Sequence, residues 1–88
     1  MGLYRIEFSQ SAERDIRKIG STLVESILAK VEALSVNPLP RQSLKLSGGE
    51  TTYRLRVGDY RVIYEVNNKD KTVFIRYIRH RKEVYRQL

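Results

Sequence analysis

The sequence predicts an α+β domain in which an N-terminal helical hairpin covers one face of an antiparallel sheet. Two observations predict this class. Between residues 12 and 34 the apolar residues recur at helical spacing, and from residue 43 onward they recur at every second position, as in a strand. A chain of 88 residues is long enough for one hydrophobic core and too short for two. Residues 1–88 are therefore expected to form a single domain.

The first elements are a strand and a short helix. Apolar and charged residues alternate from Tyr4 to Phe8, which is typical of a half-buried strand. Ala12, Ile16 and Ile19 then follow at helical spacing, and the helix is expected to stop at Gly20.

A second helix is expected between Ser21 and the segment 37–40, in which two prolines end it. Ser21 and Thr22, with Glu25 after them, can cap its N-terminus. Its apolar stripe consists of Val24, Ile27, Leu28, Val31 and Leu34. Two consecutive amphipathic helices make an αα-hairpin.

The C-terminal half reads as a series of strands. Residues 43–46 can form a short strand, with a turn at Gly48-Gly49. The strands 53–57 and 60–66 are joined by the two-residue turn Gly58-Asp59.

The last strand is expected at residues 72–79, after a turn at 67–70. It is apolar on both faces, which favours a position inside the sheet. Residues 82–88 are expected to form a short final helix. The expected order is β-α-α-β-β-β followed by this C-terminal helix.

The alternation in the two central strands predicts a cationic patch. Their apolar residues share one parity and should face the helices; these are Tyr53, Leu55, Val57, Tyr60, Val62 and Tyr64. The opposite parity holds Arg54, Arg56 and Arg61, which should therefore stand together on the uncovered face.

The composition excludes several kinds of site. The chain has no cysteine and a single histidine, His80, so disulfide frameworks, thiolate nucleophiles and Cys/His zinc sites are ruled out. We expect neither a metal nor a cofactor. There is no apolar stretch of membrane-spanning length and no signal-peptide pattern at the start, which favours a cytoplasmic protein without membrane contact.

The charge is strongly positive and unevenly distributed. The formal net charge is +7; residues 1–44 contain six Lys/Arg against five Asp/Glu, and residues 45–88 contain eleven against five. This asymmetry indicates a polyanionic partner, either a nucleic acid or an acidic protein segment.

Two segments carry a resemblance to a known family. The run YRLRVGDYRVIY at residues 53–64 and the ending RHRKEVY at residues 79–85, after a helical hairpin, resemble the RelE/ParE superfamily of bacterial and archaeal toxins. The resemblance covers nearly the whole chain and favours the RelE branch. It implies a toxin that cleaves mRNA in the ribosomal A site and is held inactive by a cognate antitoxin. Contact with operator DNA is expected only through the antitoxin complex.

The resemblance also implies roles for single residues. Arg61 and Arg81 match positions that contact phosphate or stabilise the transition state, and Tyr85 matches a functional tyrosine. Arg54 and Arg56 stand where the best-known members have lysines, one of which is assigned as the general base. Arginine keeps its proton at any working pH, so these two residues can bind RNA but are poor bases.

Metal-free RNA cleavage sets its own chemical requirements. The 2′-OH attacks the phosphorus, so the protein must accept a proton, neutralise the phosphorane and protonate the leaving oxygen. Guanidinium groups suit the neutralisation, and Arg79 and Lys82 are further candidates for RNA binding.

Two residues are candidates for proton transfer. Histidine is the side chain that titrates near neutrality, which makes His80 one candidate, and neighbouring cations would favour the phenolate form of Tyr85. Each also has a structural interpretation: His80 shares strand parity with Phe74 and Ile78 and can be half-buried, and Tyr85 can anchor the last helix.

Two other functions compete with RNA cleavage. A ParE-like, non-enzymatic inhibitor of DNA gyrase could use the same scaffold. An RRM-like RNA-binding sheet would need aromatic residues on the open face, and strands 53–57 and 60–66 provide none there. Glu65 is expected to pair with an arginine.

Overall fold

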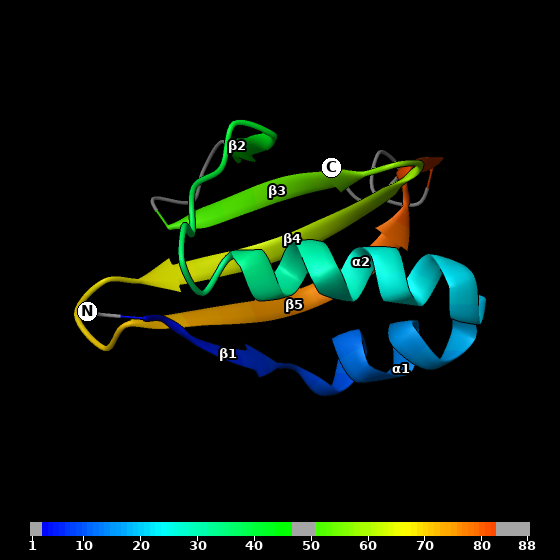
Figure 1. Cartoon of the computed structure of the whole chain (residues 1–88), viewed down its shortest axis with the longest axis horizontal. Coiled ribbons are helices and arrows are strands. Elements are labelled where there is room, and N and C mark those ends of the chain that lie inside the picture. Colours follow the sequence, from blue (N-terminus) through cyan, green and yellow to red (C-terminus); the bar gives the residue numbers. More distant parts are fainter. Residues whose placement is uncertain (1–2, 47–50, 83–88) are drawn as a thin grey trace.

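The computed structural model describes residues 3–46 and 51–82. Its elements are β1 (Arg5–Phe8), α1 (Gln10–Lys18), α2 (Ser21–Ala33), β2 (Ser43–Lys45), β3 (Thr52–Val57), β4 (Tyr60–Asn67) and β5 (Thr72–His80). Both helices contribute to one hydrophobic core on the same side of the sheet (Figure 1). The predicted α+β class, with a helical hairpin on one face, is confirmed.

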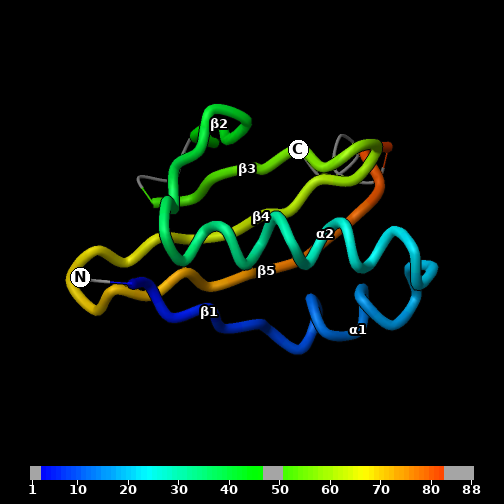
Figure 2. Tube along the Cα trace, viewed as in Figure 1, coloured from blue at the N-terminus to red at the C-terminus, as the bar shows by residue number. Residues whose placement is uncertain are grey.

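The five strands form one sheet in the order β1-β5-β4-β3-β2, which can be followed along the chain trace in Figure 2. Strands β2 to β5 are an antiparallel meander. β1 pairs in parallel with β5, because the helical hairpin and the meander bring β5 beside it in the same direction. The expectation of a wholly antiparallel sheet is wrong at this edge. The expected order β-α-α-β-β-β lacks one strand, because β2 also joins the sheet. The interior position of β5 is confirmed.

The helix boundaries follow from their caps. Ser9 Oγ accepts a hydrogen bond from the backbone N–H of Ala12 at 3.0 Å and caps α1. α2 has Gly20 as its N-cap and no side-chain cap, so the expected cap from Ser21 and Thr22 is wrong; Ser21 already lies inside the helix. Within the described residues, no helix is long and apolar enough to cross a membrane.

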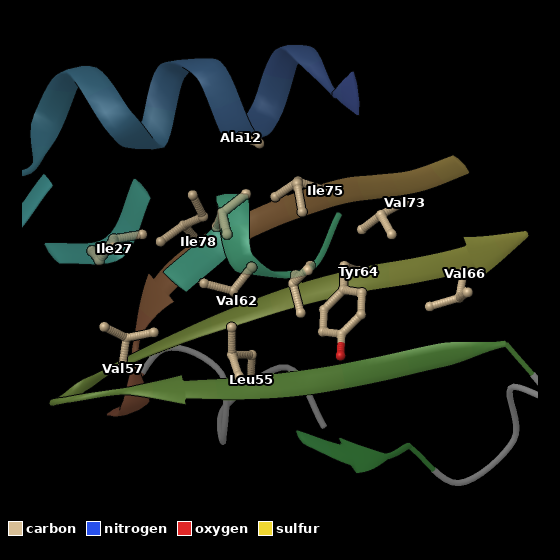
Figure 3. Packing of buried hydrophobic residues seen from close by; sticks show 12 residues of the cluster. Ala12, Ile27, Leu55, Val57, Val62, Tyr64, Val66, Val73, Ile75 and Ile78 are labelled. Carbon is tan, nitrogen blue, oxygen red and sulfur yellow. The ribbon is translucent and has the colours of Figure 1, made fainter. Parts of the chain in front are cut away.

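The core lies between the helices and the sheet (Figure 3). β3 and β4 contribute the residues that strand parity predicted for this face, together with side chains from β5 and both helices. The buried members are Ala12, Ile27, Val31, Leu34, Leu55, Val57, Val62, Tyr64, Val66, Val73, Ile75 and Ile78. The Tyr64 hydroxyl donates to the carbonyl oxygen of Pro38 at 2.7 Å, and burial raises the pKa of this hydroxyl above its ordinary value.

A β-bulge inverts the parity of β5. Ile63 pairs with Tyr77 but Tyr64 pairs with Ile75, so Arg76 is the extra residue. Val73 and Ile75 before the bulge and Ile78 after it therefore all reach the core. Phe74 and Tyr77 both lie on the opposite face. The expectation that His80 shares a face with Phe74 is wrong because of this bulge.

The predicted turn at Gly48-Gly49 and most of the predicted helix 82–88 lie outside the described residues. Arg81 and Lys82, which are described, have helical conformation directly after β5.

Candidate nucleic-acid interface

The face of the sheet opposite the helices, here called the arginine face, carries a group of arginines at the end near the β3–β4 turn: Arg54, Arg56, Arg61 and Arg79. The register places Arg56 opposite Arg61 and Arg61 opposite Arg79, so these three form a row across β3, β4 and β5. Arg54 belongs to the next row, opposite Ile63. Directly opposed residues of antiparallel strands share a face, with their Cα atoms about 4.5–5.5 Å apart. The structure thus brings Arg54, Arg56 and Arg61 together, as strand parity predicted.

Arg61 is not a freely exposed member of this group. The residue is only 5% exposed, and its Nη1 donates to the carbonyl oxygens of Gly58 at 3.1 Å and Tyr60 at 3.0 Å. Gly58 has φ of +60°, a conformation that glycine adopts without strain and that suits the first position of a type II′ hairpin turn. Arg61 therefore holds the β3–β4 turn while it stands in the arginine row.

Arg54 and Arg56 line a shallow depression together with Arg61. The depression has a volume of about 390 Å³ and is completed by Arg41, Gln42 and Leu44 from the segment around β2. Arg56 is exposed and Arg54 half-buried. Arg41 was not among the predicted site residues, because its position beside β3 depends on how the 34–42 segment folds back. The cationic side chains lining this depression suit a phosphate group.

Arg79 bends from the row toward α1. Its Nε lies 3.5 Å from Asp15 Oδ2, and its Nη2 donates to Ser11 Oγ at 3.1 Å. The guanidinium carbon lies 4.6 Å from the ring centroid of Tyr77. Asp15 also accepts a hydrogen bond from the backbone N–H of Ile78 at 2.9 Å. Sequence reasoning missed Ser11 and Asp15; their four-residue spacing puts them on one helix face, but nothing in it identifies Arg79 as the partner.

Arg81 and Lys82 follow β5 at the end of the sheet where the arginines gather. The backbone N–H of Arg81 donates to the carbonyl oxygen of Asp59 at 2.8 Å, so the chain after β5 is attached to the β3–β4 turn. Both side chains are exposed. Tyr85 lies outside the described residues.

His80 lies on the helix-facing side of the sheet rather than on the arginine face. It is opposite Tyr60, whose ring packs against the core, and the two rings meet edge to face at 5.6 Å. Its Nδ1 accepts a hydrogen bond from the backbone N–H of Lys82 at 3.4 Å. The structure does not bring His80 together with Arg54, Arg56 and Arg61.

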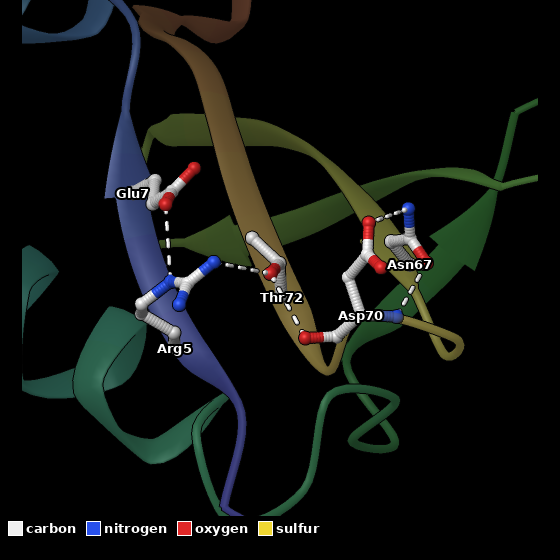
Figure 4. Close-up of polar contacts among 5 residues, drawn as sticks. All are labelled: Arg5, Glu7, Asn67, Asp70 and Thr72. Carbon is white, nitrogen blue, oxygen red and sulfur yellow. Dashed lines mark hydrogen bonds and ion pairs between the residues drawn. The ribbon is translucent and has the colours of Figure 1, made fainter.

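The far end of the arginine face is polar but internally paired (Figure 4). Arg5 Nε lies 3.1 Å from Glu7 Oε2, and Arg5 Nη2 donates to Thr72 Oγ1 at 3.5 Å. Asn67 Nδ2 donates to Asp70 Oδ2 at 3.1 Å, and the Asp70 N–H donates back to Asn67 Oδ1 at 2.9 Å.

Glu65 continues this paired region. It forms an ion pair with Arg76, as the sequence predicted for Glu65. It lies opposite Phe74, which the bulge has placed on this face. The positive charge of the arginine face is therefore concentrated at the end where β3 and β4 turn.

A family model and several known proteins match this chain. The model for the ParE toxin of type II toxin-antitoxin systems matches residues 6–85. The mRNA interferase toxin RelE of Escherichia coli K12 is 34% identical over 87 residues, which cover 93% of this chain and 90% of that protein. Toxin RelG of Mycobacterium tuberculosis is 32% identical over 92 residues, covering 96% of this chain and 98% of the relative.

Solved structures show the same fold. RelE in the archaeal RelE–RelB complex of Pyrococcus horikoshii superposes with a TM-score of 0.80 at 32% identity, covering 92% of this chain and 97% of that one. The isolated RelE toxin of Escherichia coli superposes with a TM-score of 0.78 at 26% identity, covering 97% and 99% of the two chains.

Proposed function

Because the chain belongs to the RelE/ParE superfamily of type II toxin-antitoxin toxins, in its RelE-like branch, we propose that it is an endoribonuclease that cleaves mRNA in the A site of the ribosome. A relative at 34% identity is named an mRNA interferase. The observation that carries the proposal is the row formed by Arg56, Arg61 and Arg79 on three adjacent strands, with Arg54 beside it.

The proposed reaction is attack of a 2′-OH on the adjacent phosphorus, which forms a 2′,3′-cyclic phosphate, breaks the bond between phosphorus and the 5′-oxygen, and releases that oxygen as a 5′-OH after it gains a proton. The phosphorane that forms carries more negative charge than the substrate, so cations fixed in place stabilise it more than the ground state. Arg61 is well suited to this task, because its contacts with the turn carbonyls hold the guanidinium before RNA arrives. The exposed Arg81, next to the same turn, supplies a second cation.

Proton transfer is assigned to Tyr85 in this proposal. Arg54 and Arg56 keep their protons and serve as RNA-binding cations. His80 lies beside Tyr60 on the helix-facing side, which favours a structural role for it. Tyr85 follows Arg81 by four residues in a basic stretch of the sequence, and cations near a tyrosine favour the phenolate form, which can accept the 2′-OH proton.

A cognate antitoxin is the proposed controlling partner. Similar toxins were solved in complexes with RelB, from Pyrococcus horikoshii and from Methanococcus jannaschii. We propose that an acidic antitoxin segment orders on the arginine face and neutralises its charge. Operator DNA would then be contacted only through the complex.

A second candidate is inhibition of DNA gyrase without catalysis, which the match to the ParE family model favours. Expression of the chain in bacterial cells separates the two. RNA cleavage predicts rapid arrest of translation with new mRNA ends inside codons, and gyrase inhibition predicts DNA damage with mRNA intact. Mapping mRNA 5′ ends and measuring DNA breaks in the same culture tests both.

A further inference from the structure

The contacts of Arg79 differ from those of the other arginines on the arginine face. Asp15 is near its Nε at 3.5 Å, and Ser11 accepts from its Nη2 at 3.1 Å. Both partners come from α1, and the Tyr77 ring supports the guanidinium at 4.6 Å. The Asp15 and Arg79 side chains are only 14% and 24% exposed, so this ion pair is better shielded from solvent than the exposed Arg5–Glu7 pair.

Asp15 is itself fixed by the backbone. Its Oδ2 accepts from the N–H of Ile78 at 2.9 Å, next to the residue that it orients. β1 pairs with β5 only as far as Ile75, and beyond this point α1 replaces the strand as the neighbour of β5. One carboxylate therefore joins the helix both to the backbone of β5 and to the Arg79 guanidinium.

We propose that Asp15 is a positioning residue that, with Ser11, orients Arg79 for binding an RNA phosphate. This inference rests on the proposed function. The two contacts occupy Nε and Nη2 and leave Nη1 out of both. A guanidinium held at one edge and stacked on a ring has lost most of its rotational freedom, so little further entropy is lost when it binds phosphate.

The sign of the charge makes this role testable. A carboxylate close to a phosphate site repels the phosphate, so its neutralisation should by electrostatics alone strengthen RNA binding. If Asp15 acts by orienting Arg79, neutralisation weakens binding instead. Glu13 is the matched control, since it lies on the same helix, its side chain is 55% exposed, and Glu13→Gln adds the same charge as Asp15→Asn.

The test measures binding of a labelled short single-stranded RNA to the full chain over a series of salt concentrations. Asp15→Asn keeps an oxygen for the Ile78 N–H and removes the charge. We expect it to weaken binding about tenfold or more, the change for one lost charge-assisted contact, while Glu13→Gln binds as tightly as the parent or more so. Arg79→Ala should weaken binding similarly and lower the salt slope by about one. Adding Asp15→Asn to Arg79→Ala should then cause no further weakening, because only the electrostatic effect of removing the carboxylate remains.

A second variant distinguishes the loss of the contact with Arg79 from a loss of folding. Ser11→Ala removes only the contact with Nη2, changes no charge, and should weaken binding in the same direction as Asp15→Asn. The inference is overturned if Asp15→Asn and Ser11→Ala bind RNA as well as Glu13→Gln does, or if Asp15→Asn weakens binding equally with and without Arg79. A parental chain that binds RNA but leaves mRNA uncut on ribosomes contradicts the proposed function instead, and the binding series still decides the role of Asp15.

Discussion

The guanidinium of Arg61 donates to the backbone carbonyl oxygen of Gly58 at 3.1 Å, across the turn that joins β3 to β4. The central residue of the arginine row is thus also part of the scaffold. The side chain is almost fully buried. A variant truncated at this position would remove the hydrogen-bond donor of both carbonyl oxygens.

Arg61→Ala is therefore expected to reduce both stability and activity. The carbonyl oxygens of Gly58 and Tyr60 lose a charged donor, which should lower the free energy of unfolding by about 1–3 kcal/mol. The exposed Arg56 is the control, and Arg56→Ala should stay within about 0.5 kcal/mol of the parent. Urea unfolding measures both; equal stability of the two variants would contradict a structural role for Arg61.

Arg81→Ala should reduce activity without reducing stability. Its side chain is exposed, and its contact with Asp59 is made by the backbone, which the substitution preserves. Loss of a cation that acts mainly on the transition state should slow cleavage by about 10²–10³-fold. Lys69→Ala, an exposed charge in the β4–β5 turn, is the control for net charge. Single-turnover cleavage at the parental rate would remove Arg81 from the mechanism.

The strand pattern predicted the faces of β3 and β4 but not those of β5. Alternation predicted that Leu55 and Val62 face the core and that Arg54 lies on the other face. This prediction was correct because the two strands pair without interruption. In β5 the bulge at Arg76 shifts the register. A bulge depends on pairing between distant segments, so the local sequence around Phe74 gives no sign of it.

The sequence predicted the positive charge of the candidate site but not the contacts that its side chains make. Which arginines share a face follows from period-two alternation. The burial of Arg61 depends on the turn geometry, and the orientation of Arg79 depends on α1, far away in the sequence. The parallel pairing of β1 with β5 is likewise a long-range contact between the two ends of the fold.

Tyr85→Phe and His80→Gln should separate proton transfer from packing. Tyr85→Phe keeps the ring and removes the hydroxyl, so we expect about a 10²-fold or greater loss of single-turnover rate. His80 lies beside Tyr60 on the opposite side of the sheet from Arg54, Arg56 and Arg61, so His80→Gln should cleave at close to the parental rate. The reverse order of the two rates would transfer the proton role to His80.

Tyr64 should make the fold sensitive to alkaline pH. Burial raises its pKa in the folded state, so above the ordinary value of about 10 the unfolded chain loses this proton first. The stabilisation is complete below that pH and declines as the pH rises through the folded-state pKa. Unfolding free energies at about pH 8 and about pH 11 should therefore differ less for Tyr64→Phe than for the parent. The variant should also lose about 1 kcal/mol at the lower pH, because Pro38 loses its hydrogen-bond donor.

Antitoxin binding should depend on salt. If an acidic segment neutralises the arginine face, the complex weakens as ionic strength rises, and the double variant Arg54→Ala with Arg56→Ala has a smaller salt dependence than the parent. Titration calorimetry with the purified antitoxin measures both. An affinity that does not change between low and high salt would exclude the electrostatic part of the proposal.

The central claim is that the arginine face supports attack by the 2′-OH on mRNA in the ribosome. The most direct measurement uses purified ribosomes programmed with a defined mRNA, with and without a single 2′-deoxy nucleotide at the cleavage position. We predict that the parental chain cuts the natural mRNA inside the A-site codon, leaves a 2′,3′-cyclic phosphate and a 5′-OH, and does not cut the deoxy-substituted mRNA. Cleavage of both mRNAs at equal rates would contradict the mechanism, and cleavage of neither would contradict the proposed function.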